Sequence, residues 1–239
     1  MAFSSSDSPL PRLEALRAQI AQQAEQDPLI GVKLGSQEAM ELLIDHLKTD
    51  RGVHAETLMA TAGALAGNSV QAALWEEARH AGQDRCAGLH LVRCNDDSCY
   101  WVGDALNRKL VEGYGSPWQV LSETAKQEGC RALPSVEHLL LEGLQRLGTP
   151  AFGHPHVPVE HTPEVLKADE QDRLWCMVRP LCEICCQVPA EWPLLCGLLA
   201  ARAMRLVKPA LGPDLALRLA MDSAIDAAKR PLGQITMAP

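Results

Sequence analysis

The spacing of apolar positions predicts α-helices along most of the chain. One clear stripe places apolar residues at positions i, i+3, i+4 and i+7, namely Met40, Leu43, Ile44 and Leu47. Ser36 precedes this stripe, and serine is a favoured residue at helix N-termini, so we expect the helix to begin there. The same criteria, applied with proline and glycine as boundaries, predict about nine helices in all.

The longest predicted helix covers residues 54–80 and carries little charge before Glu76. Alanine and glycine fill it, including Gly63 and Gly67. Glycine inside a helix costs about 1 kcal/mol relative to alanine, so these positions need a compensating interaction. Small residues three or four positions apart allow a second helix to approach closely. We therefore expect this helix to be central and buried on most of its sides.

One region alternates with the two-residue period of β-strands. Residues 89–94 and 99–102 show this alternation, and residues 95–98 between them are turn formers. The pattern predicts a β-hairpin. An isolated two-stranded hairpin is marginally stable in water, and its edges invite pairing. We therefore expect the hairpin to lie against a helix or to pair with its copy in a second subunit.

The second half of the chain has its own boundaries. Ser135 can cap a helix whose inner face carries apolar residues at helical spacing, namely Val136, Leu139, Leu140, Leu144 and Leu147. Residues 149–163 follow as a loop that contains four prolines and three histidines. A new helix is predicted to start at residues 162–164, where threonine, proline and glutamate follow one another.

Together these elements predict a mainly α fold, a multi-helix array around a long buried central helix, with one β-hairpin. The length of 239 residues and the hydrophobic content of 47% can supply a substantial core, which excludes global disorder. We expect a single helical domain over residues 1–239, and residues 149–163 are the candidate place for a subdivision.

Charge and composition exclude several functional classes. The formal net charge of −8 and the aromatic content of 4% argue against a nucleic-acid partner, which requires a basic surface and stacking side chains. The most apolar run, residues 58–67, is too short for a bilayer span, which needs roughly 20 residues. The N-terminus lacks the features of a signal peptide. We therefore expect a soluble, cytoplasmic protein without a membrane partner.

The standard catalytic motifs of nucleotide-binding proteins, serine hydrolases and zinc proteases are absent from the sequence. The chain has nine cysteines, which the cytosol would keep reduced. Their densest cluster is Cys182, Cys185 and Cys186, in which the C-x-x-C spacing is compatible with metal binding or redox chemistry. Buried, inert thiols are the interpretation that we favour.

Histidines and glutamates supply two further candidate metal sites. Glu77 and His80 form an E-x-x-H pattern, which places both side chains on one face of a helix, as in di-iron bundles. His154 and His156 form an H-x-H pattern in a proline-rich loop. Each pattern occurs once, so we favour a polar helix end for the first pair and an exposed loop for the second.

Four aromatic residues fall around the hairpin and the helices after it, namely Tyr100, Trp101, Tyr114 and Trp118. Amphipathic aromatic residues of this kind are enriched at protein interfaces. They can equally form the core between the hairpin and the helices. Both interpretations stay open at this point.

Two stretches resemble a family of uncharacterised bacterial proteins of similar length. The first is Gly-Val-His-Ala-Glu-Thr-Leu at residues 52–58, which continues through residues 62–67. The second is Tyr-Trp-Val-Gly-Asp-Ala-Leu-Asn at residues 100–107. The resemblance covers most of the chain. It implies no activity, and it therefore assigns no functional residue.

Two hypotheses about function follow. The first is a non-catalytic, homodimeric binding or interaction protein that needs no cofactor and whose ligand stays open. It is favoured by the missing catalytic motifs, the hairpin and the aromatic residues around it. The second is a metal-binding or thiol-redox enzyme that uses Glu77 with His80, or the cluster from Cys182 to Cys186, with zinc or iron as its cofactor. We favour the first.

Overall fold

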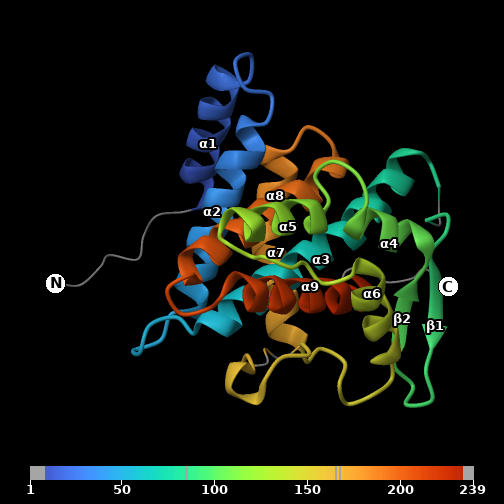
Figure 1. Cartoon of the computed structure of the whole chain (residues 1–239). Helices are drawn as coiled ribbons and strands as arrows, with labels where there is room; N and C mark the ends of the chain where they lie inside the picture. Colours follow the sequence, from blue (N-terminus) through green and yellow to red (C-terminus); the bar gives the residue numbers. More distant parts are fainter. Residues whose placement is uncertain (1–8, 84–85, 165, 167, 234–239) are drawn as a thin grey trace.

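The computed structural model describes residues 9–83, 86–164, 166 and 168–233. Helices dominate this part of the chain, as predicted (Figure 1). The α-helices are α1 (Pro9–Gln23), α2 (Ile30–Leu47), α3 (Ala55–His80), α4 (Asp104–Val111), α5 (Pro117–Gln127), α6 (Val136–Gln145), α7 (Ala168–Cys185), α8 (Trp192–Val207) and α9 (Pro213–Lys229). The shorter elements are β1 (His90–Arg93), β2 (Cys99–Val102) and two 3₁₀ turns, η1 (Val159–His161) and η2 (Pro189–Glu191).

The central position of α3 confirms the prediction made from its small residues. Helices α8 and α9 pack along α3 (Figure 1). Most of the α3 residues are buried. A Cβ atom on Gly63 would lie 2.2 Å from the carbonyl oxygen of Ala220, and one on Gly67 would lie 2.1 Å from that of Ala224. Because any larger residue would collide with the α9 backbone, glycine at both positions is what allows the two helices to meet.

The predicted hairpin is also confirmed, with β1 antiparallel to β2 and Leu91 opposite Trp101. The inner strand β2 is well covered, because the Trp101 ring packs edge-on against Trp75 of α3 at 5.1 Å between centroids. Tyr100, on the other face of the strand, packs against Phe152 at 4.6 Å. These contacts bury two of the four clustered aromatic residues in the core. All four residues of β1 are exposed.

The predicted start of α2 at Ser36 is wrong. The helix already begins at Ile30, and Ser36 lies inside it, where its hydroxyl donates a hydrogen bond to the carbonyl oxygen of Lys33 at 2.7 Å. The earlier start follows from packing, since Gly31 and Gly35 bring this part of α2 against Cys185 of α7. Tertiary contact therefore extends the helix across a residue that resembles a cap.

Two predictions in the second half of the chain are also wrong. Residues 162–164 are not helical, because the backbone N–H of Glu164 donates to the hydroxyl of Thr57 at 2.9 Å, and α7 starts only at Ala168. Ser135 caps α6 as predicted, but the inner face of that helix is narrower than expected. Leu139 is buried, whereas Leu144 is 45% exposed.

Within the described residues, no helix combines the length and the apolar character that a bilayer crossing requires. The segment between α6 and α7 does not separate the helices on its two sides. Helix α3 precedes this segment, yet it packs against α8 and α9, which follow it.

The contact between α3 and α9 yields the first testable prediction. We expect Gly67→Ala to lower the free energy of unfolding by about 1–3 kcal/mol, because the new methyl group forces two backbones apart. Gly197→Ala in α8 is the matched control, since its Cβ would meet nothing closer than Val120 at 3.4 Å. Urea denaturation measures both. A Gly67→Ala protein as stable as the control would contradict this account of the contact.

Candidate functional site

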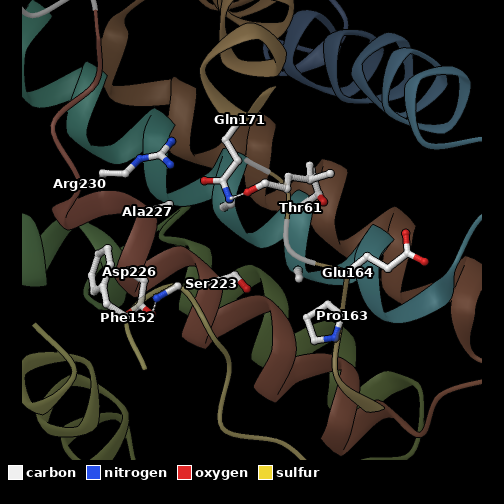
Figure 2. Close-up of a pocket in the computed structure, with 13 residues that line it drawn as sticks. Thr61, Phe152, Pro163, Glu164, Gln171, Ser223, Asp226, Ala227 and Arg230 are labelled. Carbon is white, nitrogen blue, oxygen red and sulfur yellow. Dashed lines mark hydrogen bonds between the residues drawn. The ribbon is translucent and has the colours of Figure 1, made fainter. Parts of the chain in front are cut away.

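A cavity of about 180 Å³ lies where α3, α7 and α9 meet the segment between α6 and α7. Figure 2 shows the residues that surround it. Part of the wall is apolar, from Ala60, Ala64, Phe152, Pro163, Leu166 and Ala227. The polar side chains of the wall are Thr61, Glu164, Gln171, Ser223, Asp226 and Arg230. Segments that are distant in sequence therefore build one small cavity.

Two hydroxyl groups of this wall have no hydrogen-bond partner among the described residues, those of Thr61 and Ser223. Thr61 is only 6% exposed, and Ser223 is half-buried. Neither hydroxyl oxygen is among the fully enclosed polar atoms that lack a partner, so both can be reached from the cavity. The two hydroxyls are therefore available to a bound molecule.

The carboxylate of Asp226, in contrast, already accepts hydrogen bonds from other parts of the protein. Its oxygens accept hydrogen bonds from Arg146 Nη2 at 2.8 Å and Nε at 3.1 Å, and from the backbone N–H of Gly153 at 3.0 Å. Burial raises the pKa of Asp226, while the bonds from Arg146 act in the opposite direction. The ion pair therefore holds the Gly153 segment against α9 and leaves little charge for a ligand.

This ion pair continues into a larger polar network beside the cavity. Asp222, which is fully buried, accepts hydrogen bonds from Arg218 Nε at 2.9 Å and from the backbone N–H of His156 at 2.8 Å. Arg218 also contacts Glu142 of α6. Burial works to raise the pKa of Glu142, but hydrogen bonds with His156 and Arg218 outweigh it and lower that pKa. The network ties α6, α9 and the connecting segment together.

The far end of the same segment is held at the N-terminus of α3. The carboxylate of Glu56 contacts His161 Nδ1 at 2.9 Å and His54 Nε2 at 3.2 Å. Three residues after His161, the backbone N–H of Glu164 donates a hydrogen bond to the Thr57 hydroxyl. The segment between α6 and α7 is therefore hydrogen-bonded to α9 and to the N-terminus of α3, and it covers part of the cavity between these contacts.

Arg230 occupies the other side of the cavity, directly after α9. Its Nη2 atom donates to Asp172 at 3.0 Å. Burial lowers the pKa of Arg230, although the charge of Asp172 opposes this effect. The backbone at Arg230 is fixed by the buried Gln71 of α3, whose Nε2 donates to the carbonyl oxygens of Ala228 at 2.7 Å and of Arg230 at 2.8 Å.

The cysteine candidates lie mostly in the core. Cys182 and Cys185 are buried, and Cys186 is partly buried. The thiol of Cys182 contacts that of Cys196 in α8, at 4.0 Å between sulfur atoms. A hydrogen bond with Cys196, together with burial, raises the pKa of Cys182 well above its ordinary value, and burial raises that of Cys185 to about 11. Thiols in this state are protonated at neutral pH and are poor nucleophiles.

The structure places the remaining candidates on the surface or in other contacts. Glu77 accepts a hydrogen bond from Lys109 at 2.6 Å, and the exposed His80 lies beside Arg79. The side chains of His154 and His156 are exposed. In the part of the chain that the structure describes, no three histidine, cysteine, aspartate or glutamate side chains are grouped as metal ligands. Metal binding by these residues stays a prediction.

Sequence reasoning missed the charged residues of α9. Asp222, Asp226 and Lys229 lie at positions i, i+4 and i+7 in a helix rich in alanine and leucine. Charges on one face of such a helix are a usable signal for a buried polar network. Arg146 and Arg230 gave no such signal, since they cap the C-terminal ends of α6 and α9.

Comparisons with known proteins identify no relative. No model of a protein family matches the sequence, and neither a curated protein nor a solved structure is significantly similar to it. The function must therefore be inferred from the chain's own residues.

Lys229 is a buried cation at the edge of this network. It is 1% exposed, and its ammonium group donates a hydrogen bond to the carbonyl oxygen of Ile225 at 3.2 Å. Burial lowers its pKa from 10.5 to about 8, against the attraction of Asp226. The unfolded chain therefore binds this proton more tightly than the native protein does, and the charge destabilises the fold below pH 8.

We expect Lys229→Met to raise the free energy of unfolding at pH 7 by on the order of 3 kcal/mol, because methionine carries no charge to bury. The gain should shrink as the pH rises from 8 to 10.5, because native Lys229 is neutral above pH 8 and the loss of its proton costs less as the pH approaches 10.5. Chemical denaturation across this range measures it, with Lys126→Met at an exposed position as the control. A gain that does not change with pH would contradict the assignment.

Proposed function

We propose that this chain is a non-catalytic binding protein that holds a small molecule in the cavity between α3, α7 and α9. The observation that supports this most directly is the Thr61 hydroxyl, which lines the cavity and has no hydrogen-bond partner among the described residues. The surrounding polar groups are rigidly supported by ion pairs and by the Gln71 contacts. A preformed cavity with a few convergent polar groups is typical of small-molecule sites.

The chemistry of the wall favours binding over catalysis. A serine nucleophile needs a base within hydrogen-bond reach, and Ser223 has no such partner among the described residues. The carboxylate of Asp226 is occupied by Arg146 and Gly153, so it does not serve as a free base. Of the sequence-based expectations, the location in the cytoplasm and the bacterial family stay predictions.

Filling the cavity tests the proposed function. We expect Ala64→Leu to abolish binding of any small molecule that the native protein retains, because the larger side chain takes up the space that Ala64 leaves open. Ala18→Leu is the matched control, since it makes the same change on an exposed face of α1. Mass spectrometry of small molecules released from each purified protein, together with a thermal-shift screen of a metabolite library, measures the effect.

The proposal fails if no compound stabilises the native protein. It also fails if the compounds that do so act equally on the Ala64→Leu protein. Circular dichroism of all three proteins establishes that the substitutions leave the helical fold intact.

The exposed edge of the hairpin supports a second proposal, that two copies of the chain form a dimer through β1. The Cys94 N–H donates to the Ser98 carbonyl at 2.8 Å, so alternate residues of β1 bond to β2. The backbone groups of Leu91 and Arg93 then point outward. Leu91 and Val92 are each 40% exposed beside this open edge. An antiparallel copy centred on Val92 would pair Leu91 with the partner's Arg93 and satisfy both edges.

We expect the native protein to be a dimer by light scattering and Val92→Glu to be a monomer, because two carboxylates would meet at the centre of the paired strands. Val188→Glu, at an exposed apolar position elsewhere, should leave the dimer intact. A native protein that stays monomeric at every concentration measured would rule this arrangement out.

A further inference from the structure

The two ion-paired side chains of the cavity wall, Asp226 and Arg230, differ in how much of their hydrogen-bonding capacity is already used. Asp226 is compensated by Arg146, which makes two hydrogen bonds with its carboxylate. Arg230 makes one hydrogen bond, to Asp172, and that aspartate is 38% exposed and therefore partly hydrated. The guanidinium group of Arg230 has five N–H donors, so most of its donors are left for another acceptor. The cavity wall therefore offers unused guanidinium N–H donors on its Arg230 side.

Figure 2 shows the Arg230 guanidinium directed toward Gln171. Gln171 donates through Nε2 to the Leu166 carbonyl oxygen at 3.2 Å, which leaves its second amide proton for a ligand. The Glu164 side chain, in contrast, extends away from the space between Gln171 and Ser223. An anionic group next to Arg230 and Gln171 would therefore meet donors at close range, while the Glu164 carboxylate is exposed to solvent.

The position of this cation is fixed before any ligand binds. The Gln71 side chain donates to the carbonyl oxygens of Ala228 and Arg230 and accepts a hydrogen bond from the Leu232 N–H at 3.1 Å. Gln71 is itself fully buried. Because the backbone is held in this way and the guanidinium group is itself bound to Asp172, the side chain has less conformational freedom to lose on binding, which favours affinity.

Resting on the proposed function above, we propose that the cavity binds a small organic carboxylate with a short hydroxyl-bearing tail. Arg230 and Gln171 hold the carboxylate, because a guanidinium fork matches the two oxygens of such a group. The free hydroxyls of Thr61 and Ser223 bind the hydroxyl of the tail. Ala64 and Ala227 pack against its carbons. This apolar wall favours a carboxylate with a carbon tail over inorganic phosphate.

Lactate and lactamide form a matched pair of probes, since they have the same shape and differ in charge. We expect lactate to bind the native protein on the order of tenfold more tightly than lactamide in calorimetry, the factor that a charge-assisted hydrogen bond of about 1.5 kcal/mol supplies. Arg230→Gln should remove this difference, and Gln171→Leu should reduce it. Arg205→Gln, at an exposed position of α8, should leave it unchanged. Inorganic phosphate should bind more weakly than lactate.

The outcomes separate this inference from the proposed function. Equal binding of lactate and lactamide, abolished by Ala64→Leu, would overturn the carboxylate assignment and leave the cavity as a binding site. The same holds if neutral compounds bind while lactate, pyruvate and butyrate do not. Tighter binding of phosphate than of lactate would overturn the organic carboxylate as the ligand and indicate an inorganic anion instead. If no probe and no library compound binds, both the assignment and the proposed function fail.

Discussion

Helices α3 and α9 approach so closely that the carbonyl oxygens of Ala220 and Ala224 occupy the space where side chains on Gly63 and Gly67 would stand. Each glycine costs helix stability, and the burial of two helix faces offsets that cost. Because α8 also packs on α3, this contact decides where the other helices of the bundle can lie. The fold therefore depends on two positions at which a single methyl group would separate the backbones.

The same contact creates the cavity and its polar wall. The α3 and α9 backbones come into contact at the two glycines, and side chains beside this contact, such as Thr61 and Ser223, line one small cavity. Charged residues of α9 are buried there because the connecting segment and α6 cover them. Arg146 offsets the burial of Asp226 by two hydrogen bonds. Lys229 has no carboxylate within hydrogen-bond distance among the described residues, and burial therefore lowers its pKa.

Much of the fold could be predicted because its signals are local. The cap at Ser135, the hairpin turn and the small-residue helix depend on neighbours within a few positions, and all of them are confirmed. The predicted helix starts were wrong where a contact with a residue distant in sequence determines the local structure. Ser36 resembles a cap but is drawn into α2 by packing on α7. The Thr-Pro-Glu start at residues 162–164 is prevented by a hydrogen bond from the backbone to Thr57.

The sequence by itself determined that α3 would be long, rich in small residues and closely packed, since the helical period and the size of a side chain are local properties. It also carried the charged face of α9 at positions 222, 226 and 229. Only the tertiary structure decided that Thr61, Gln171 and Arg230 share one cavity. No spacing rule relates residues so far apart in the chain, because their distance is set by how three helices and a connecting segment pack. The candidate site is therefore a property of that packing.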